Sequence, residues 1–340
     1  MRHQKGRCYI IAEAGSNHDG KLSQALSLID VAAEAGASAV KFQLFQAKKL
    51  YAKKAGTSDY LKNERSIFDI IRDVELPLEW LPLLQERCRE RGVDFMASAF
   101  DEESVDRLDP FVSVHKCASY EMTHAPLLRH LALKKKPLIV STGAAKLAEV
   151  AQAIQVIEGA QNFELTLLQC TASYPTPLKQ ANVQAMLTMS QRFGYPVGLS
   201  DHTREPSIAP CAAVALGASV IEKHFTLSNS LPGPDHRFAL EPNELQQMIR
   251  DIRATEDALG DGEKEPLSVE LELRSFARRS IFTSRRVIQG ESLTAENLII
   301  LRNGKLSPGL PPEMYTALLG KKLRRALDEQ QPITREDLLE

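Results

Sequence analysis

Short apolar runs that alternate with segments of helical periodicity are the feature that most constrains the fold of this chain. The runs are rich in Val, Ile, Leu and Phe, and most of them precede a stretch in which apolar residues recur every three or four positions. Such alternation predicts parallel strands joined by helices. We expect strands at residues 9–14, 39–45, 94–99, 113–118, 138–142, 165–171, 197–201 and 220–225. This number suits a closed (β/α)8 TIM barrel, an α/β fold.

Two helix predictions support the barrel. Residues 23–35 carry recurrent apolar side chains and precede Gly36, a residue type that commonly ends helices. Pro242 opens a second helical segment, which runs to Leu259 and precedes Gly260. A doubly wound open sheet is the competing architecture. Its commonest form is excluded because no G-x-G-x-x-G sequence follows the first predicted strand.

The length of the chain favours one large domain and one small domain. A barrel needs about 250 residues, and the chain has 340. Barrel-like alternation stops after Gly260, where the sequence becomes polar and charged. We predict a barrel at 1–262, a linker at 263–275 and a compact, irregular, β-rich domain at 276–340. The long segment 47–77, between the second and third strands, is predicted to form a lid or a subunit contact.

The composition excludes several classes of partner. The chain is 43% hydrophobic and 25% charged, with a formal net charge of -2, which provides no field for nucleic acid. No apolar run approaches the roughly 18 residues of a membrane helix, and the first residues lack the apolar core of a leader. We therefore expect a cytoplasmic protein without a membrane partner. The five cysteines are scattered without a C-x-x-C pair, so neither a disulfide framework nor a zinc knuckle is expected.

Polar residues gather where the predicted strands end. Side chains at the carboxyl ends of barrel strands, and in the loops that follow, face the active site of such a fold. The residues at these positions are Glu13, Lys41, Gln43, Ser98, Lys116, Ser119, Glu121, Ser141, Tyr174, Ser200, His202 and His224. A barrel that served only as a scaffold could place such residues on its rim at random, so each one alone carries little weight.

Lys41 and Lys116 lie inside apolar strands, where an unpaired ammonium group costs several kcal/mol. Both therefore need an anion. One interpretation is a salt bridge to a glutamate, either Glu13 or Glu121. The serines of the predicted mouth favour the other, a clamp for the phosphate or carboxylate of a ligand. A Schiff-base aldolase, which needs one lysine in a desolvated pocket, remains open.

Two histidines follow successive strands, His202 in GLSDHT and His224 in EKHF. Neutral imidazoles at such positions can share one divalent cation with open coordination positions, although each could instead be a loop hydrogen-bonder. Tyr174 and Asp235 lie in proline-rich loops after the sixth and eighth strands. Rigid turns of this kind often carry binding residues, although each residue could equally form the turn.

The motifs at these positions resemble those of the N-acetylneuraminate (sialic acid) synthase family. In chain order they are IIAEAGSNHDG, VKFQ, HKCASYE, STG, CTASYPTP, GLSDHT, EKHFTL and LPGPDH. The resemblance covers essentially the whole chain, since the part from Phe276 onward resembles the antifreeze-like (SAF, β-clip) domain of that family. Within the family, the run APCAAVALGA resembles the sequences of one branch, that of the spore coat polysaccharide biosynthesis protein E.

The resemblance implies condensation of phosphoenolpyruvate with an open-chain N-acetylated amino sugar, such as N-acetylmannosamine, to give a nonulosonic acid and phosphate. It implies a divalent cation, Mn2+ or Mg2+, held by His202 and His224. Phosphoenolpyruvate would be bound by Lys41, Ser98, Lys116, Ser119, Ser141 and Ser200. The sugar would be bound by Glu13, Gln43, Tyr174, Asp235 and, within a domain-swapped homodimer, Arg302. The residues expected to be catalytic are Glu13, Glu121 and Lys116.

The sequence departs from the family pattern on the side expected to meet the sugar. Ala172 replaces an asparagine, Ser228 and Asn229 replace an Asp-Arg pair, and Asn303 replaces a proline. The reaction type is therefore better supported than the identity of the sugar. The competing functions are a related 3-deoxy-ulosonic acid synthase and a non-catalytic sugar-binding protein of polysaccharide assembly.

Overall fold

The chain forms two compact units. The structure, a computed structural model, describes residues 6–57 and 65–339. The first unit is Met1–Gly260 and the second is Asp261–Glu340. The linker predicted at 263–275 contains a helical turn at Ser268–Glu270 and most of the short helix α11 (Leu271–Ala277).

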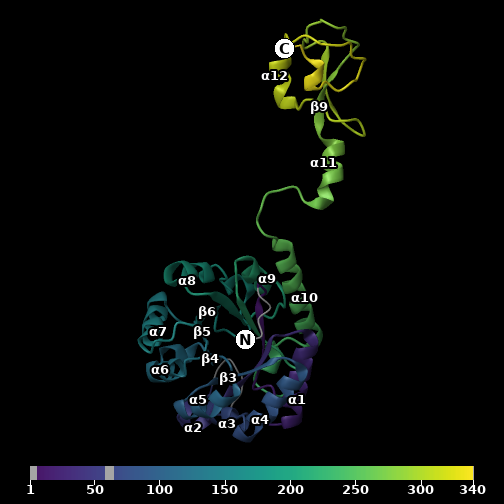
Figure 1. Cartoon of the computed structure of the whole chain (residues 1–340). Coiled ribbons are helices and arrows are strands. Elements are labelled where there is room, and N and C mark those ends of the chain that lie inside the picture. The colour runs from purple at the N-terminus through teal and green to yellow at the C-terminus, as the bar shows by residue number, and fades with distance from the viewer. Residues whose placement is uncertain (1–5, 58–64, 340) are drawn as a thin grey trace. The chain divides into compact units, whose positions relative to one another are not determined.

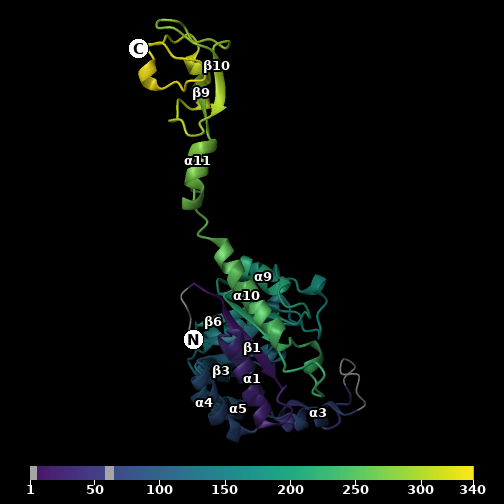
Figure 2. The same cartoon turned by 90° about the vertical axis from the view of Figure 1, so that its right-hand side faces the viewer.

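The first unit is a closed barrel of eight parallel strands, in which helices follow the strands along the chain (Figures 1 and 2). This confirms the predicted (β/α)8 barrel. The strands are β1 (Tyr9–Gly15), β2 (Ala39–Leu44), β3 (Asp94–Ala99), β4 (His115–Cys117), β5 (Leu138–Ser141), β6 (Leu165–Cys170), β7 (Val197–Asp201) and β8 (Val220–His224). The helices are α1 (Leu22–Ala35), α2 (Ala47–Leu50), α3 (Ile67–Asp73), α4 (Leu81–Arg91), α5 (Glu102–Leu108), α6 (Ala125–Leu133), α7 (Leu147–Gly159), α8 (Ala185–Phe193), α9 (Ile208–Ala215) and α10 (Pro242–Leu259).

Each strand pairs in parallel with the next, and β8 pairs with β1. In this register Glu13 lies beside Lys41 of β2 on one side and beside His224 of β8 on the other. The closure of the barrel therefore brings together residues that are more than 200 positions apart in the sequence. The strand predicted at 113–118 is shorter than expected, because its ladder with β5 spans only His115–Cys117.

Alternation along the strands gives the barrel two cores, because successive side chains of a strand point to opposite faces. The outward side chains pack against the surrounding helices. The inward side chains of the N-terminal half form a separate apolar layer inside the barrel. This inner layer consists of Tyr9, Ile11, Ala39, Met96, Val114, Ile139, Leu168 and Val220.

Helices α1 and α10 pack against each other on the outside of the barrel. Helix α1 ends at Gly36, whose φ of 90° lies in the left-handed region and lets its N–H reach the carbonyl groups of Ala32 and Ala33. Helix α10 begins with Pro242 and a capping box between Glu241 and Glu244. Both helix predictions are therefore confirmed, within one residue at the start of α1.

The segment predicted as a lid or subunit contact contains helices α2 and α3. Residues 58–64 of this segment lie outside the described residues. Helix α3 begins at an N-cap, Ser66, whose hydroxyl accepts a hydrogen bond from the backbone N–H of Phe68. The role of a lid stays a prediction.

The second unit is irregular and β-rich, as predicted. Its sheet pairs β9 (Arg279–Thr283) with β10 (Leu298–Arg302) in antiparallel fashion, and a short helix α12 (Tyr315–Leu318) follows. Its own core includes Ile281, Val287, Leu293, Leu318, Leu323, Leu327 and Ile333. Across the described residues of both units, no helix combines the length and the apolar character needed to cross a membrane.

Candidate functional site

The candidate site lies inside the barrel, where the strands end. Ile11 belongs to the inner apolar layer, and Glu13, two residues further along β1, shares its face. The same step leads from Ala39 to Lys41 on β2 and from there to Gln43. The inward side chains of a strand recur every second residue, so the apolar layer is followed, two residues further along each strand, by a polar layer. The other inward polar residues reached in this way are Ser98, Lys116, Ser141, Cys170, Glu222 and His224.

Lys41 is held between two carboxylates. Its ammonium Nζ lies 2.7 Å from Glu13 Oε2 and 3.7 Å from Glu222 Oε2. It also donates a hydrogen bond of 3.3 Å to Ser98 Oγ, and Gln43 Nε2 donates one of 3.0 Å to Glu13 Oε1. The salt-bridge interpretation therefore holds for this lysine, because Glu13 is its partner.

Lys116 is less completely paired than Lys41. Its Nζ donates to Ser141 Oγ at 2.7 Å and to the carbonyl of Cys117 at 2.9 Å, while Glu222 Oε1 lies 3.8 Å away. Ser200 Oγ donates to the same Glu222 oxygen at 3.1 Å. Only 1% of the Lys116 side chain is exposed. This ammonium group is thus buried, bound to neutral acceptors and separated from its carboxylate by more than a hydrogen bond.

Burial and neighbouring charges shift the pKa values of Glu13, Glu222 and Lys116. Burial is the largest effect on Glu13 and raises the pKa of its carboxyl to about 7, against the lowering effect of Lys41. Burial also acts on Glu222, but the ammonium groups of Lys116 and Lys41 outweigh it and hold the pKa of Glu222 below its usual value. The pKa of Lys116 is lowered by burial. A pair of carboxyl groups with separated pKa values can supply one proton carrier and one fixed charge.

The two histidines lie next to this charge cluster and next to each other. The ring centroids of His202 and His224 are 5.4 Å apart. Tyr174 packs over both rings, at 4.3 Å from His202 and 6.1 Å from His224. His202 Nδ1 lies 3.0 Å from the carbonyl oxygen of Thr171, so this nitrogen carries the proton and donates it. Burial lowers the pKa of His202, but Cys170, the Thr171 carbonyl and Asp201 outweigh it and hold that pKa above its usual value. In the neutral form of the ring, the lone pair of Nε2 is left for another partner.

His224 carries an unsatisfied buried nitrogen. Its Nδ1 has no hydrogen-bond partner and lies 3.9 Å from Asp235 Oδ2. Burial, and then His202 and the nearby lysines, hold the pKa of His224 well below its usual value, so the ring is neutral and can act as a ligand. Over residues 6–57 and 65–339, no group of three or more His, Cys, Asp or Glu side chains is arranged to hold a metal ion. A cation here would rest on two imidazoles and on oxygens from water or substrate.

Ser119 and Glu121 occupy the loop after β4. Ser119 Oγ accepts a hydrogen bond of 3.0 Å from the backbone N–H of Gly143, in the loop after β5. Burial raises the pKa of the Glu121 carboxyl, whose Oε2 is buried without a hydrogen-bond partner. An unsatisfied buried carboxyl of this kind is a candidate for contact with a ligand.

The carboxyl group of Asp235 lies close to Gly15 at the end of β1. Ser16 Oγ donates a hydrogen bond of 3.3 Å to Asp235 Oδ2, and burial raises the pKa of this carboxyl. A Cβ at Gly15, whose φ is +54°, would lie 2.9 Å from the same oxygen and 3.5 Å from both Gln43 Nε2 and His224 Cε1. Glycine at this position therefore permits the three side chains to converge.

A cavity of about 480 Å³ opens beside Tyr174 and Phe238. Phe238 packs against Tyr174 and His224, with ring centroids 5.1 and 5.2 Å away. The other walls come from the loop after β1, from helix α3 and from the loop between β8 and α10, and they include Asp19, Asp73, Asn229 and Arg237. The cavity is thus lined by the two aromatic rings that pack against the histidines and by charged groups of both signs.

The residues predicted for the site lie at the end of the barrel, except Arg302, which belongs to the second unit. Arg302 ends β10 in the second unit, where its side chain is exposed, and its contact with the sugar stays a prediction. Two residues of the site were not predicted from the sequence: Glu222, which contacts both lysines, and Cys170, whose Sγ lies 3.7 Å from His202 Nδ1. The signal for Glu222 was present, since it stands two residues before His224 on the same strand and so shares its face.

Comparison with known proteins gives a consistent result over the whole chain. A model of the NeuB family matches residues 28–264, and a model of the SAF domain matches residues 278–339. The spore coat polysaccharide biosynthesis protein SpsE of Bacillus subtilis is 41% identical over 97% of this chain and 93% of its own length. The crystal structure of that protein superposes with a TM-score of 0.68 and 40% identity, covering 99% of this chain and 96% of the other.

A named enzyme is equally similar in sequence. The N,N'-diacetyllegionaminic acid synthase of Legionella pneumophila is 41% identical over 93% of this chain and 90% of its own length. Both relatives therefore extend over the barrel and the second unit alike.

Proposed function

The chain belongs to the NeuB family, and on that premise we propose that it condenses phosphoenolpyruvate with an open-chain N-acetylated amino sugar, giving a nonulosonic acid and phosphate. Relatives named as synthases of such acids support this proposal. The observation that carries it is the position of two buried ammonium groups, on Lys41 and Lys116, beside two imidazoles at the end of the barrel.

The charge cluster is suited to an anion with two charged ends. Glu13, Glu222, Lys41 and Lys116 sum to zero formal charge when all are ionised, so an incoming phosphate and carboxylate can compete with the two glutamates for the ammonium groups. Lys116 is the lysine that we expect to pair with the anionic ligand, because its ammonium group donates only to neutral acceptors, a hydroxyl and a carbonyl. The other hydroxyls proposed to bind phosphoenolpyruvate belong to Ser98, Ser119, Ser141 and Ser200.

The reaction forms a bond between C3 of the enol phosphate and the aldehyde carbon of the sugar, whose oxygen takes up a proton. Water then adds at C2 and loses one proton, which leaves a hydroxyl and the phosphate on C2. The bond from C2 to the phosphate oxygen breaks as the hydroxyl becomes the C2 carbonyl, and the hydroxyl proton leaves with the phosphate. Lys41 and Lys116 hold the anionic groups in place, so the encounter of two substrates becomes an intramolecular event. Glu13 can accept or return a proton at neutral pH, since its pKa is raised to about 7.

We propose His202 and His224 as the residues that hold a divalent cation, Mn2+ or Mg2+. The unsatisfied Nδ1 of His224 and the available Nε2 of His202 fit this role. When bound, the cation supplies Lewis-acid polarisation of the aldehyde. Tyr174, Asp235 and Gln43 are proposed to contact the sugar, and Glu121 to lie near the reacting carbons.

Arg302 has a place in this proposal only through the second unit. We propose that the chain forms a homodimer in which the second unit of each protomer covers the barrel of the other and brings Arg302 to the sugar. Light scattering coupled to size exclusion tests the dimer, and a monomer at the working concentration would refute this part.

The experiment that tests the function is phosphate release from phosphoenolpyruvate, with Mn2+ or Mg2+, across N-acetylated hexoses and 2,4-diacetamido sugars. The expected result is release with one class of sugar, loss of release with a chelator, and an acid product identified by NMR. Release with no sugar from metal-loaded protein would contradict the proposal.

The lowered pKa of Lys116 also suits a Schiff-base aldolase, so that alternative is tested separately. Borohydride is added to the protein during turnover, and the intact mass of the chain is measured. Our proposal expects no added mass. A covalent adduct on Lys116 would favour the aldolase.

A further inference from the structure

Asn229 uses its whole amide group to hold the loop between β8 and α10. Its Nδ2 donates hydrogen bonds of 2.6 Å to the carbonyl of His236 and 2.8 Å to the carbonyl of Ala239. Its Oδ1 accepts one of 3.1 Å from Arg204 Nη2. An amide offers two N–H donors and an acceptor oxygen, so this set occupies both donors of Asn229 and gives its acceptor a partner. The side chain thus acts on the loop and has no donor left for a ligand.

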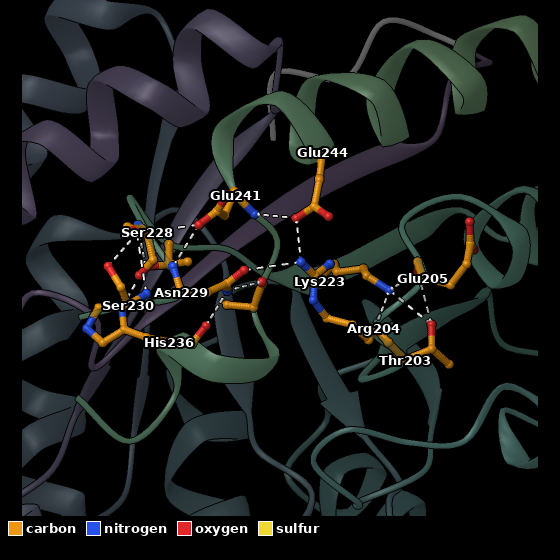
Figure 3. A network of polar contacts seen from close by, with 12 residues as sticks. Thr203, Arg204, Glu205, Lys223, Ser228, Asn229, Ser230, His236, Glu241 and Glu244 are labelled. Atoms are coloured by element: carbon orange, nitrogen blue, oxygen red, sulfur yellow. Dashed lines mark hydrogen bonds and ion pairs between the residues drawn. The ribbon is translucent and has the colours of Figure 1, made fainter. Parts of the chain in front are cut away.

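The partner of Asn229 comes from a different loop, as Figure 3 shows. Arg204 lies after β7 and bridges Asn229 to Glu244 of helix α10, at 2.8 Å from the Glu244 carboxylate. Glu244 also accepts from the backbone N–H of Glu241, and Glu241 accepts from the backbone N–H of Asn229 at 2.9 Å. The loops that follow His202 and His224 are therefore tied to the first turn of one helix.

The backbone on either side of Arg204 is held by hydrogen bonds from Lys223. Lys223 of β8 is 2% exposed and donates hydrogen bonds of 2.7 Å to the carbonyl of Thr203 and 2.8 Å to the carbonyl of Glu205 (Figure 3). Its ammonium group is also paired with the buried carboxylate of Asp201. The backbone on both sides of Arg204 is thus anchored to the strand that carries Glu222 and His224.

The loop that Asn229 holds carries Asp235 and one wall of the cavity. His236 is fixed within it by Thr226 Oγ1, 2.6 Å from Nδ1, and by Asp19 Oδ1, 3.0 Å from Nε2. A Cβ on Gly233 would lie 2.3 Å from Asp19 Oδ1, so the loop approaches the Asp19 side chain closely at this glycine. We expect loss of the Asn229 contacts to release this wall and Asp235 from their present position.

We propose that Asn229 is a positioning residue that determines specificity for the far end of the acceptor sugar, acting through Asp235 and the wall formed by residues 231–238. The inference rests on the proposed function, because it concerns the same reaction and the same cavity. It assigns a reason to one departure of this sequence: only an amide at position 229 satisfies two carbonyl groups and a guanidinium at once. The phosphoenolpyruvate side of the site, formed by Lys41 and Lys116, does not share these contacts.

The test compares Asn229→Asp with Ser230→Ala. The aspartate keeps the shape and the acceptor for Arg204 but loses both donors and faces two carbonyl groups. Ser230 is exposed in the same loop, and its hydroxyl contacts Ser228, so its alanine variant is the matched control. We expect Asn229→Asp to raise KM for the acceptor sugar about tenfold or more, while KM for phosphoenolpyruvate changes by less than about twofold. Ser230→Ala should leave both constants unchanged.

A second measurement separates this inference from the proposed function. Hydrogen exchange of backbone amides in residues 231–240 should become faster in Asn229→Asp and stay unchanged in Ser230→Ala, whether or not the protein turns over any sugar. If Asn229→Asp does not fold, Arg204→Met takes its place, because Nη2 of Arg204 donates to both Asn229 and Glu244, and methionine removes that donor while keeping an unbranched side chain. Unchanged exchange, or equal increases in both KM values, would overturn the inference. Absence of phosphate release with faster exchange would overturn the proposed function alone.

Discussion

Replacing Lys116 with methionine is expected to weaken the binding of phosphoenolpyruvate by about a hundredfold to a thousandfold. Methionine keeps an unbranched chain of similar length, so the packing of this fully buried position is largely retained. The change leaves Glu13, Glu222 and Lys41 with a net charge of about minus one, against which an anion must bind. An ammonium group about 4 Å from an anion contributes roughly 4 kcal/mol at an effective dielectric constant of 20, and about 1.4 kcal/mol corresponds to a tenfold change.

Titration calorimetry with phosphoenolpyruvate measures this effect without the acceptor sugar. The matched control is Glu222→Gln, which removes a negative charge from the same cluster and keeps an acceptor for Ser200. Binding by this variant should be equal to or tighter than that of the unchanged chain. Thermal unfolding establishes that both variants are folded. If Lys116→Met binds phosphoenolpyruvate within threefold of the unchanged chain, or if Glu222→Gln is weakened to the same degree, the charge argument is refuted.

Three further predictions concern the metal, the loop and the dependence of stability on pH. Alanine at His202 or His224 should abolish Mn2+ binding in calorimetry, and unchanged affinity in either variant would exclude a site shared by both imidazoles. Gly233→Ala should lower the free energy of unfolding by about 1–3 kcal/mol in urea titrations, since its Cβ would lie 2.3 Å from Asp19 Oδ1. Burial lowers the pKa of His18 to about 4, so the folded state binds fewer protons than the unfolded state, whose histidine titrates near 6.5. Stability is therefore expected to fall by about 3 kcal/mol between pH 6.5 and pH 4, and His18→Asn, which keeps an acceptor for the N–H of Gly20, should flatten that fall.

The sequence predicted most of the barrel because each strand is specified locally. A run such as residues 94–99 is apolar, short and followed by a helix, and the structure has β3 at the same residues. The ends were less well specified where ladder bonds decide them, as in β4, because a strand boundary depends on its neighbour as well as on its own residues. The SAF-like unit was predicted from its resemblance and its change of composition, since its short pieces give little periodic signal.

The candidate site divides in the same way. The polar strand ends were found because barrels place their sites there, so Lys41, His202 and His224 were named from sequence. Glu222 was missed because it precedes the end of its strand, whereas the face that it shares with His224 follows from alternation. The hydrogen bonds that link Asn229, Arg204 and Glu244 could not be predicted from any one segment of the sequence, because these residues come from two loops and a helix.

The sequence by itself determined the order of strands and helices, the residues that point into the barrel and the kinds of charge available there, because periodicity and turn residues act over short distances. Only the tertiary structure decided which charges meet. Closure of β8 onto β1 places His224 beside Glu13, and the position of Glu222 between both lysines follows from it. The loops are likewise positioned by contacts with α10, which no single segment specifies. Pairings across a closed sheet depend on register and curvature, and these are properties of the whole barrel.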